Sequence, residues 1–179
     1  MKLEFLELVG GEPLTVQEAK EYLHIDGNDE DALIASLISA ALSYCEEYTK
    51  QVFARRRLQL TLPGRDATFM IELPRSKYLE SIESVTEIMP DGGERPLLFE
   101  GYRCGQINQL LVMNDTSDVE GDIRVIYITG REHVSDNVKT AMRLLVAGWY
   151  ENRLPYGDKA MNEVPYGIKA LLNGERVLM

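Results

Sequence analysis

The spacing of apolar residues changes period twice along this 179-residue chain, and that change constrains the fold more than any other feature. Apolar residues recur at three- and four-residue spacing up to about residue 50, alternate with polar residues through the middle, and return to helical spacing after residue 135. The outer patterns are typical of amphipathic helices and the middle one of half-buried strands. The predicted order is therefore helices, then strands, then helices.

Two helices are predicted in the first part of the chain. The first follows Thr15, which can cap free backbone N–H groups while Glu18 completes a capping box, and it ends near Leu23. The second begins at Asp29, where negative charge suits the helix dipole, and runs to about Lys50. Its apolar stripe consists of Leu33, Ile34, Leu37, Ile38, Ala41, Leu42 and Cys45.

The middle of the chain contains short alternating runs separated by turn residues. Strands are predicted at 58–62, 69–73, 82–89, 96–100, 106–113 and 122–129. Gly101 and Gly105 flank a segment that we interpret as a loop bend. Regular short strands with turns between them favour a small antiparallel sandwich or barrel.

Helical spacing resumes after Ser135, which is a predicted cap, and ends near Asn152. The apolar stripe of this helix consists of Val138, Ala141, Met142, Leu145 and Trp149. A last short helix is predicted at 165–172, with Pro165 in its first turn.

These patterns predict an α+β fold in which the N- and C-terminal helices form a small bundle and an antiparallel β domain is inserted between them. We expect a helical core of residues 1–52 and 135–179 and a β insertion of residues 53–134. Three successive layers are the alternative. The inserted arrangement is preferred because it buries both apolar stripes in one core.

The net charge is −10 and is uneven along the chain. Residues 1–52 carry 3 basic and 11 acidic side chains, which argues against tight binding to nucleic acid. No apolar stretch approaches the roughly 18 residues of a membrane-spanning helix. The N-terminus also lacks the features of a signal peptide, so we expect a soluble protein made in the cytoplasm.

No catalytic or metal-binding set is apparent in the sequence. His24 and His133 are not in a metal-ligand spacing, and no phosphate- or dinucleotide-binding motif occurs. Cys45 with a histidine could be a nucleophile and base, but its place on the apolar stripe favours a packed thiol. Cys104 lies in a loop-like stretch, and no disulfide is expected. We therefore predict no cofactor and no metal.

Two surface features are candidates for contacts with other molecules. Arg55, Arg56 and Arg57 form the chain's basic cluster, which is either a solvated linker or a contact with an acidic partner surface or DNA. Trp149 and Tyr150 end a helix, where one is expected in the core and the other could anchor a neighbouring subunit.

Taken in order, the sequence motifs resemble the longer form of the head–tail connector (adaptor) family of tailed bacteriophages. The motifs are LTVQEAKEYLHID at 14–26, DEDALI at 29–34, AAL at 40–42, EYT at 47–49, LPR at 73–75, IESV at 82–85, LLVAGWYENR at 144–153 and VPYGIKALL at 164–172. Each motif alone is capping and packing chemistry. The ordered set covers nearly all of the chain.

The resemblance implies a non-enzymatic ring subunit, dodecameric on the virion, that binds beneath the portal and presents a surface for the next head-completion or tail protein. It places the protein at the head–tail junction, with DNA passing through the channel without specific binding. The helical core would build the ring wall, residues 164–179 would dock the portal, and the acids of residues 1–52 would line the channel. Candidate contact residues are Arg55, Arg56, Arg57, Trp149, Tyr150, Arg153, Tyr166, Lys169 and Arg176.

Two other functions remain as alternatives. One is a DNA-packaging accessory protein that binds DNA through Arg55–Arg57. The other is a small hydrolase or isomerase that uses carboxylates and Cys45, which lacks a positioned nucleophile and base.

Overall fold

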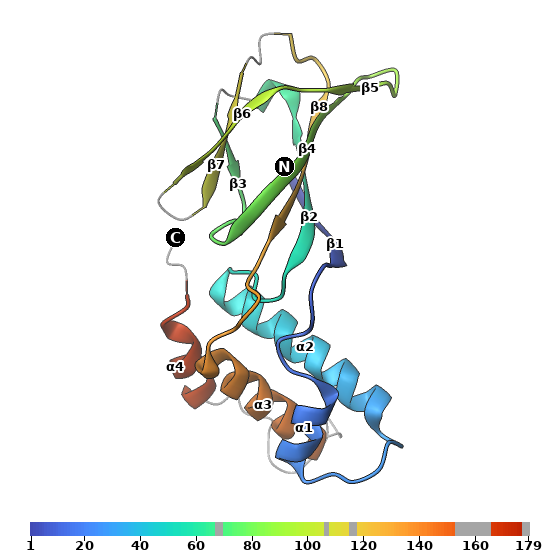
Figure 1. Cartoon of the computed structure of the whole chain (residues 1–179), viewed down its shortest axis with the longest axis vertical. Helices are drawn as coiled ribbons and strands as arrows, with labels where there is room; N and C mark the ends of the chain where they lie inside the picture. Colours follow the sequence, from blue (N-terminus) through green and yellow to red (C-terminus); the bar gives the residue numbers. More distant parts are fainter. Residues whose placement is uncertain (67–69, 106–107, 115–117, 153–165, 177–179) are drawn as a thin grey trace. The chain divides into compact units, whose positions relative to one another are not determined.

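The computed structural model describes residues 1–66, 70–105, 108–114, 118–152 and 166–176 (Figure 1). The chain forms two compact units. The β unit contains Met1–Gly11 and Ala54–Glu132, and the helical unit contains Glu12–Phe53 and His133–Met179. The fold is α+β, as the change of period predicts.

The helical unit consists of α1 (Val16–Leu23), α2 (Asp31–Thr49), α3 (Asp136–Glu151) and α4 (Tyr166–Asn173). Helix α2 packs against α3, and α3 packs against α4. Its core contains most residues of the predicted stripes together with two residues of the last helix: Ile34, Ile38, Ala41, Leu42, Cys45, Val138, Ala141, Met142, Leu145, Ile168 and Leu172. The other stripe residues, Leu33, Leu37 and Trp149, are only half-buried. Helices from the two ends of the chain thus bury their apolar faces together.

The start of α1 confirms the predicted capping box. The Thr15 hydroxyl accepts a hydrogen bond from the backbone N–H of Glu18 at 3.2 Å, and the Glu18 carboxylate accepts one from the backbone N–H of Thr15 at 2.9 Å. Ser135 occupies the N-cap position of α3 but makes no side-chain cap bond. Its hydroxyl instead donates to the Glu175 carboxylate at 3.0 Å, which ties the end of α4 to the start of α3.

The β unit contains two antiparallel sheets, with the smaller sheet beside the larger one (Figure 1). In spatial order, the larger sheet comprises β1 (Lys2–Leu8), β2 (Arg56–Pro63), β8 (Asp122–Thr129), β4 (Leu79–Ile88) and β5 (Glu94–Pro96). The smaller sheet comprises β3 (Met70–Leu73), β7 (Gln109–Met113) and β6 (Phe99–Cys104), and a 3₁₀ turn, η1 (Gly64–Asp66), follows β2.

One face of the larger sheet is buried by its alternating residues. Leu58 lies opposite Tyr127 and Leu60 opposite Val125 on neighbouring strands, and all four are buried. The Tyr127 hydroxyl donates to the carbonyl of Pro74 at 2.6 Å, so the only polar atom of this buried side chain is satisfied. That bond connects the larger sheet to the segment that leaves the smaller one.

Strand β1 corrects the expected extent of the helical core. Residues 1–11, which were expected to belong to the helical core, are part of the β unit, and Lys2–Leu8 among them form an edge strand. The alternation in this segment is short and is interrupted by a bulge between Phe5 and Glu7. Its residues pair with β2 residues that lie 48 to 59 positions further along the chain (Leu8 with Arg56, Lys2 with Thr61), a long-range contact that local periodicity does not reveal.

The predicted strand at 96–100 and the predicted loop at 101–105 are also wrong. The strand is interrupted at Leu97 and Leu98, where the chain crosses from β5 in one sheet to β6 in the other. Gly101 lies inside β6 with a φ of 150° at a register shift, so glycine here serves a bulge and Cys104 is in a strand. Parts of other predictions, including Phe69, Gln106, Ile107 and Pro165, lie outside the described residues.

Candidate interaction surfaces

The arginine cluster lies at the start of β2 and faces carboxylates on neighbouring strands. Arg55 donates to the Glu80 carboxylate through both Nε and Nη2. Arg57 pairs with Glu7 on β1 and with Glu83 on β4, where Nε lies 2.8 Å from the carboxylate. These hydrogen bonds raise the pKa of both guanidinium groups. The largest cause is the hydrogen bond to Glu80 for Arg55 and the one to Glu83 for Arg57. Arg55 and Arg57 therefore already have anionic partners.

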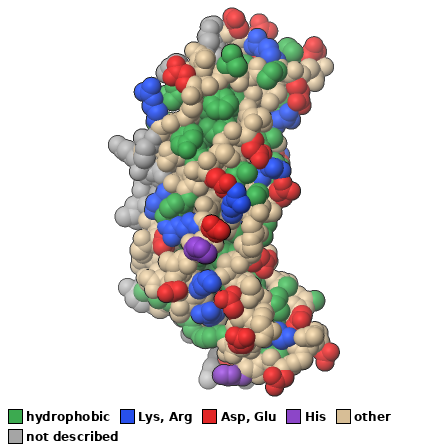
Figure 2. Space-filling model, in the orientation of Figure 1, with side chains coloured by type: hydrophobic (Ala, Val, Ile, Leu, Met, Phe, Trp, Pro, Cys, Tyr) green, Lys and Arg blue, Asp and Glu red, His purple; other side chains and the backbone are tan. Residues whose placement is uncertain are grey.

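The middle arginine has a different environment. The Arg56 guanidinium lies over the Phe5 ring at 5.5 Å from its centroid, and Arg75 lies over the same ring at 5.4 Å. Both distances are within the range of cation–π attraction. On the face that Figure 2 shows, Lys and Arg side chains are interspersed with Asp and Glu.

The exposed face of the larger sheet continues this charge pairing. Glu4 on β1 pairs with Lys2 at 2.7 Å and accepts from the Gln59 amide at 3.2 Å. Arg124 on β8 pairs with Glu94 on β5 at 2.6 Å. Exposed pairs of this kind contribute little to stability, and they keep the face polar.

The other candidate contact residues belong to the helical unit. Trp149 and Tyr150 are half-buried at the end of α3, and the Tyr150 hydroxyl donates to the Glu30 carboxylate. The Arg176 guanidinium lies over the Tyr48 ring at 5.3 Å from its centroid. The arginines of residues 55–57 thus belong to the β unit, and Trp149, Tyr150 and Arg176 belong to the helical unit.

Three of these residues can be placed only in part. Lys169 is half-buried on α4. Tyr166 begins that helix, but its side chain is outside the described part of the structure, as is the whole of Arg153. Their roles in contacts remain predictions.

A buried carboxylate in the β unit was not identified from the sequence. Glu87 on β4 is 2% exposed and accepts hydrogen bonds from the backbone N–H groups of Gly121 at 2.8 Å and Glu120 at 2.9 Å. Arg95 on β5 pairs with it at 2.7 Å. The two backbone bonds, followed by Arg95, lower the pKa of this carboxyl group. One signal in the sequence could have indicated this buried carboxylate. Glu87 lies two positions after Val85, so in an alternating strand both side chains face the same buried side.

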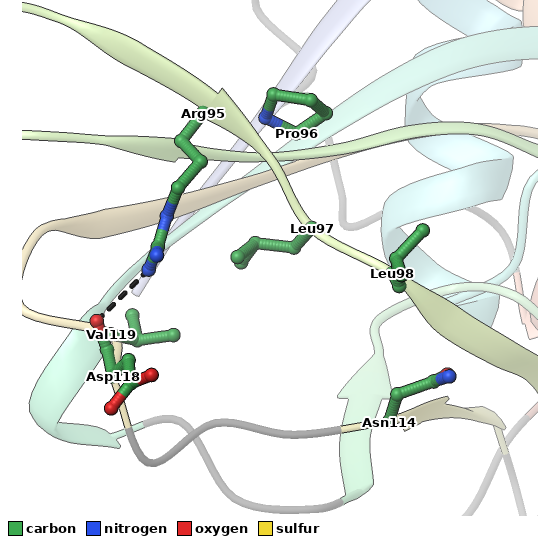
Figure 3. Close-up of a pocket in the computed structure, with 7 residues that line it drawn as sticks. All are labelled: Arg95, Pro96, Leu97, Leu98, Asn114, Asp118 and Val119. Atoms are coloured by element: carbon green, nitrogen blue, oxygen red, sulfur yellow. Dashed lines mark hydrogen bonds between the residues drawn. The ribbon is translucent and has the colours of Figure 1, made fainter.

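A hollow of about 200 Å³ opens beside the crossing from β5 to β6 (Figure 3). Its lining includes Leu97, Leu98 and Val119, and Figure 3 shows the Leu97 side chain directed into it. Arg95 closes one wall by donating to the Asp118 carbonyl at 2.9 Å. The wall is apolar with a polar rim, which suits an apolar side chain better than a charged ligand.

The groups considered for chemistry are not arranged for it. Cys45 is fully buried, and burial raises the pKa of its thiol to about 12, which disfavours the reactive thiolate. His24 is exposed at the C-terminal end of α1 in the left-handed conformation, and His133 is exposed ahead of α3. Within the described ranges, no three His, Cys, Asp or Glu residues are grouped so that they could hold a metal ion.

None of the helices in the described part of the chain combines the length and apolar character needed to cross a membrane.

Comparison with known proteins identifies the class of structural protein that this fold represents. A family model described as "Head completion protein" matches residues 12–162. Since this match spans most of the chain, the chain belongs to the head completion protein family, and the predicted resemblance is confirmed. No curated protein sequence matches significantly.

Solved structures with the same fold come from gene transfer agent (GTA) particles. A chain in the "Neck of empty GTA particle computed with C6 symmetry" has a TM-score of 0.81 at 21% sequence identity. Chains in the "Virion of native gene transfer agent (GTA) particle" and the "Neck of native GTA particle computed with C12 symmetry" have TM-scores of 0.79 and 0.78, both at 23% identity. Each match covers 100% of this chain and 97% of the other.

Proposed function

We propose that this protein is a head–tail connector subunit that forms a ring of twelve copies beneath the portal of a DNA-filled phage head. In this role it joins the portal to the next head-completion or tail protein and performs no catalysis. The observation that carries the proposal is the family match, which runs through both units from residue 12 to residue 162. The likeness to chains in particle necks, one of them computed with C12 symmetry, supports the location and the copy number.

The helical unit would form the ring wall and contribute the portal contact. The buried face of α4 is committed to the core through Ile168 and Leu172, so a partner would meet the other faces of this segment. Glu175 in this segment accepts a hydrogen bond from the Ser135 hydroxyl, and the described basic residues of the segment are Lys169 and Arg176. We therefore place the portal contact on them.

The acidic residues of the helical unit would face the channel. Glu21, Asp26 and Asp29 are exposed around the turn between α1 and α2. Like charge would let DNA pass without adhering to the wall, whereas clustered cations would bind its phosphates. Cryo-EM of the neck would contradict this placement if these side chains point away from the lumen.

The proposal is tested by complementation of a phage that lacks this protein. If the chain is a connector, heads made without it are filled with DNA and lack tails, and supplying the chain restores tailed particles. Empty heads would instead indicate a role in packaging. The assembled protein is expected at the virion head–tail junction after synthesis in the host cytoplasm.

The second candidate is a DNA-packaging accessory protein acting through Arg55–Arg57. The stacking of Arg56 and Arg75 on Phe5 is the observation that favours it, because it gathers two guanidinium groups beside the arginine cluster. The acidic net charge of −10 weighs against it.

A further inference from the structure

Strand β1 forms one edge of the larger sheet and presents large apolar side chains to solvent. Phe5, Leu6 and Leu8 are 43%, 46% and 39% exposed. The strand pairs with β2 on one side only, and no described strand pairs with its other side. An exposed apolar strand edge favours association with another chain unless it is protected by charge, proline or a covering element.

The charges on β1 do not protect this edge. Glu4 is engaged by Lys2 and Gln59, and Glu7 is engaged by Arg57. Both acids therefore have partners within the sheet, so a neighbouring surface would meet little uncompensated negative charge. The apolar side chains remain the main feature that this edge offers.

The opposite edge of the same sheet offers a complementary feature. Strand β5 is the far edge in the order β1-β2-β8-β4-β5, and the hollow beside Leu97 and Leu98 lies just beyond it (Figure 3). Leu98 is 77% exposed at this hollow. Arg95 fixes the wall by donating to the buried Glu87 carboxylate at 2.8 Å and to the Asp118 carbonyl. The hollow is thus formed before anything enters it.

We propose that β1 of one copy docks on the β5–β6 hollow of the next copy, with Leu6 entering beside Leu97 and Leu98. This contact rests on the proposed ring. An apolar projection and a pocket at different places on one molecule make a head-to-tail contact, which closes into a ring when the rotation between copies allows it. Opposite edges of one sheet supply these two different surfaces. This contact would add to the contacts between neighbouring helical units in the proposed ring wall.

Side chains rather than a continuous β ladder would make this contact. Strand β5 has three residues and includes Pro96, which has no N–H to donate. The apolar residues of β1 would meet a hollow with an exposed leucine. Arg95 at its rim is already bonded to Glu87 and to the Asp118 carbonyl, so apolar side chains would make the contact. Family membership does not itself imply this contact, because β1 precedes the residues that the family model matches.

A cysteine pair tests the contact in assembled particles. Leu6→Cys and Leu98→Cys are introduced together in a Cys104→Ser background, and the full-length variant is supplied to the phage that lacks the protein. Oxidation of purified particles should give a ladder of cross-linked species in steps of one 20.3-kDa chain. Each single variant, in the same background, should remain at the monomer position. Both positions are exposed, so circular dichroism of the purified variants should match the parent protein.

The outcomes separate this contact from the proposed function. If cryo-EM shows the ring in the variant particles but no ladder forms on oxidation, the β1 contact is wrong while the connector role stands. Dimers from Leu6→Cys alone would show a symmetric contact between two β1 strands and would overturn the head-to-tail arrangement. If particles with the unmodified chain contain no ring of it, the proposed function fails and this contact fails with it.

Discussion

The buried Glu87 carboxylate accepts a hydrogen bond from the backbone N–H of Gly121 at 2.8 Å, which ties β4 to the start of β8. This bond and the one from Glu120 lower the pKa of Glu87 below its usual value. A carboxyl group whose folded pKa is lowered stabilises the protein fully above its unfolded pKa, about 4.3. That stabilisation is lost as the pH falls through the folded value.

Glu87→Gln should therefore lower the free energy of unfolding at pH 7 and have a smaller effect at pH 3. Glutamine keeps an acceptor oxygen but loses the charge that the N–H groups and Arg95 favour. Urea unfolding at both pH values measures the difference, and Glu100→Gln, at an exposed position on β6, is the control. An equal loss at pH 3 and pH 7 would mean that the charge of Glu87 does not contribute.

The thiol of Cys45 should be unreactive in the folded protein. With a pKa of about 12, its thiolate fraction at pH 8 is on the order of 1,000-fold below that of an ordinary cysteine. In a Cys104→Ser variant, an aromatic disulfide reagent should label Cys45 only after denaturant is added. Rapid labelling of the native variant would revive the hypothesis of a nucleophilic cysteine.

Replacement of Arg55, Arg56 and Arg57 together by alanine should leave DNA binding unchanged. Carboxylates already engage Arg55 and Arg57, so few phosphate contacts are expected. If all three did bind phosphates, the slope of log affinity against log salt would fall by about 2.7 for duplex DNA. Fluorescence anisotropy over a salt series measures this slope. Arg103→Ala, at an exposed arginine elsewhere in the β unit, serves as the control.

Local chemistry made some elements predictable from the sequence. The capping box at Thr15 and Glu18 involves residues three positions apart, so its signal is contained in a few letters. The apolar stripes of α2 and α3 repeat over several helical turns, and such stripes face the core of a folded protein. Both helices could therefore be predicted from the sequence. The order of the elements then sufficed for the α+β class and the family resemblance.

Long-range pairing explains what the sequence did not reveal. Strand β1 exists because its backbone bonds to β2, and the adjacent apolar residues Phe5 and Leu6 interrupt the alternation that would indicate a strand. The arginine cluster looks basic in sequence, yet Glu80 and Glu83, which engage it, lie over twenty residues further along. Glu87 likewise depends on N–H groups from a distant segment. Partners of this kind are set by the register of the sheet.

Loss of the Thr15 cap should destabilise the helical unit. Thr15→Ala removes the acceptor for the Glu18 N–H and the donor to its carboxylate, and should lower the free energy of unfolding by about 1 kcal/mol. Thr15→Ser keeps a hydroxyl and should cost much less. Thermal unfolding followed by circular dichroism measures both variants, and equal losses would indicate that the methyl group of Thr15 matters rather than its cap.

Two substitutions in α4 should have different effects, one on the stability of the chain and the other on particle assembly. Leu172 is fully buried, so Leu172→Ala should lower the free energy of unfolding by about 2–5 kcal/mol through lost contacts and a residual cavity. Lys169 lies on the same helix and is half-buried, so Lys169→Glu leaves no comparable cavity and should lower the free energy of unfolding much less than Leu172→Ala. If Lys169 contacts the portal, this charge reversal should nevertheless reduce the yield of tailed particles in the complementation assay. Normal yields from Lys169→Glu would remove Lys169 from the portal contact, and urea unfolding of both purified variants provides the matched measure of stability.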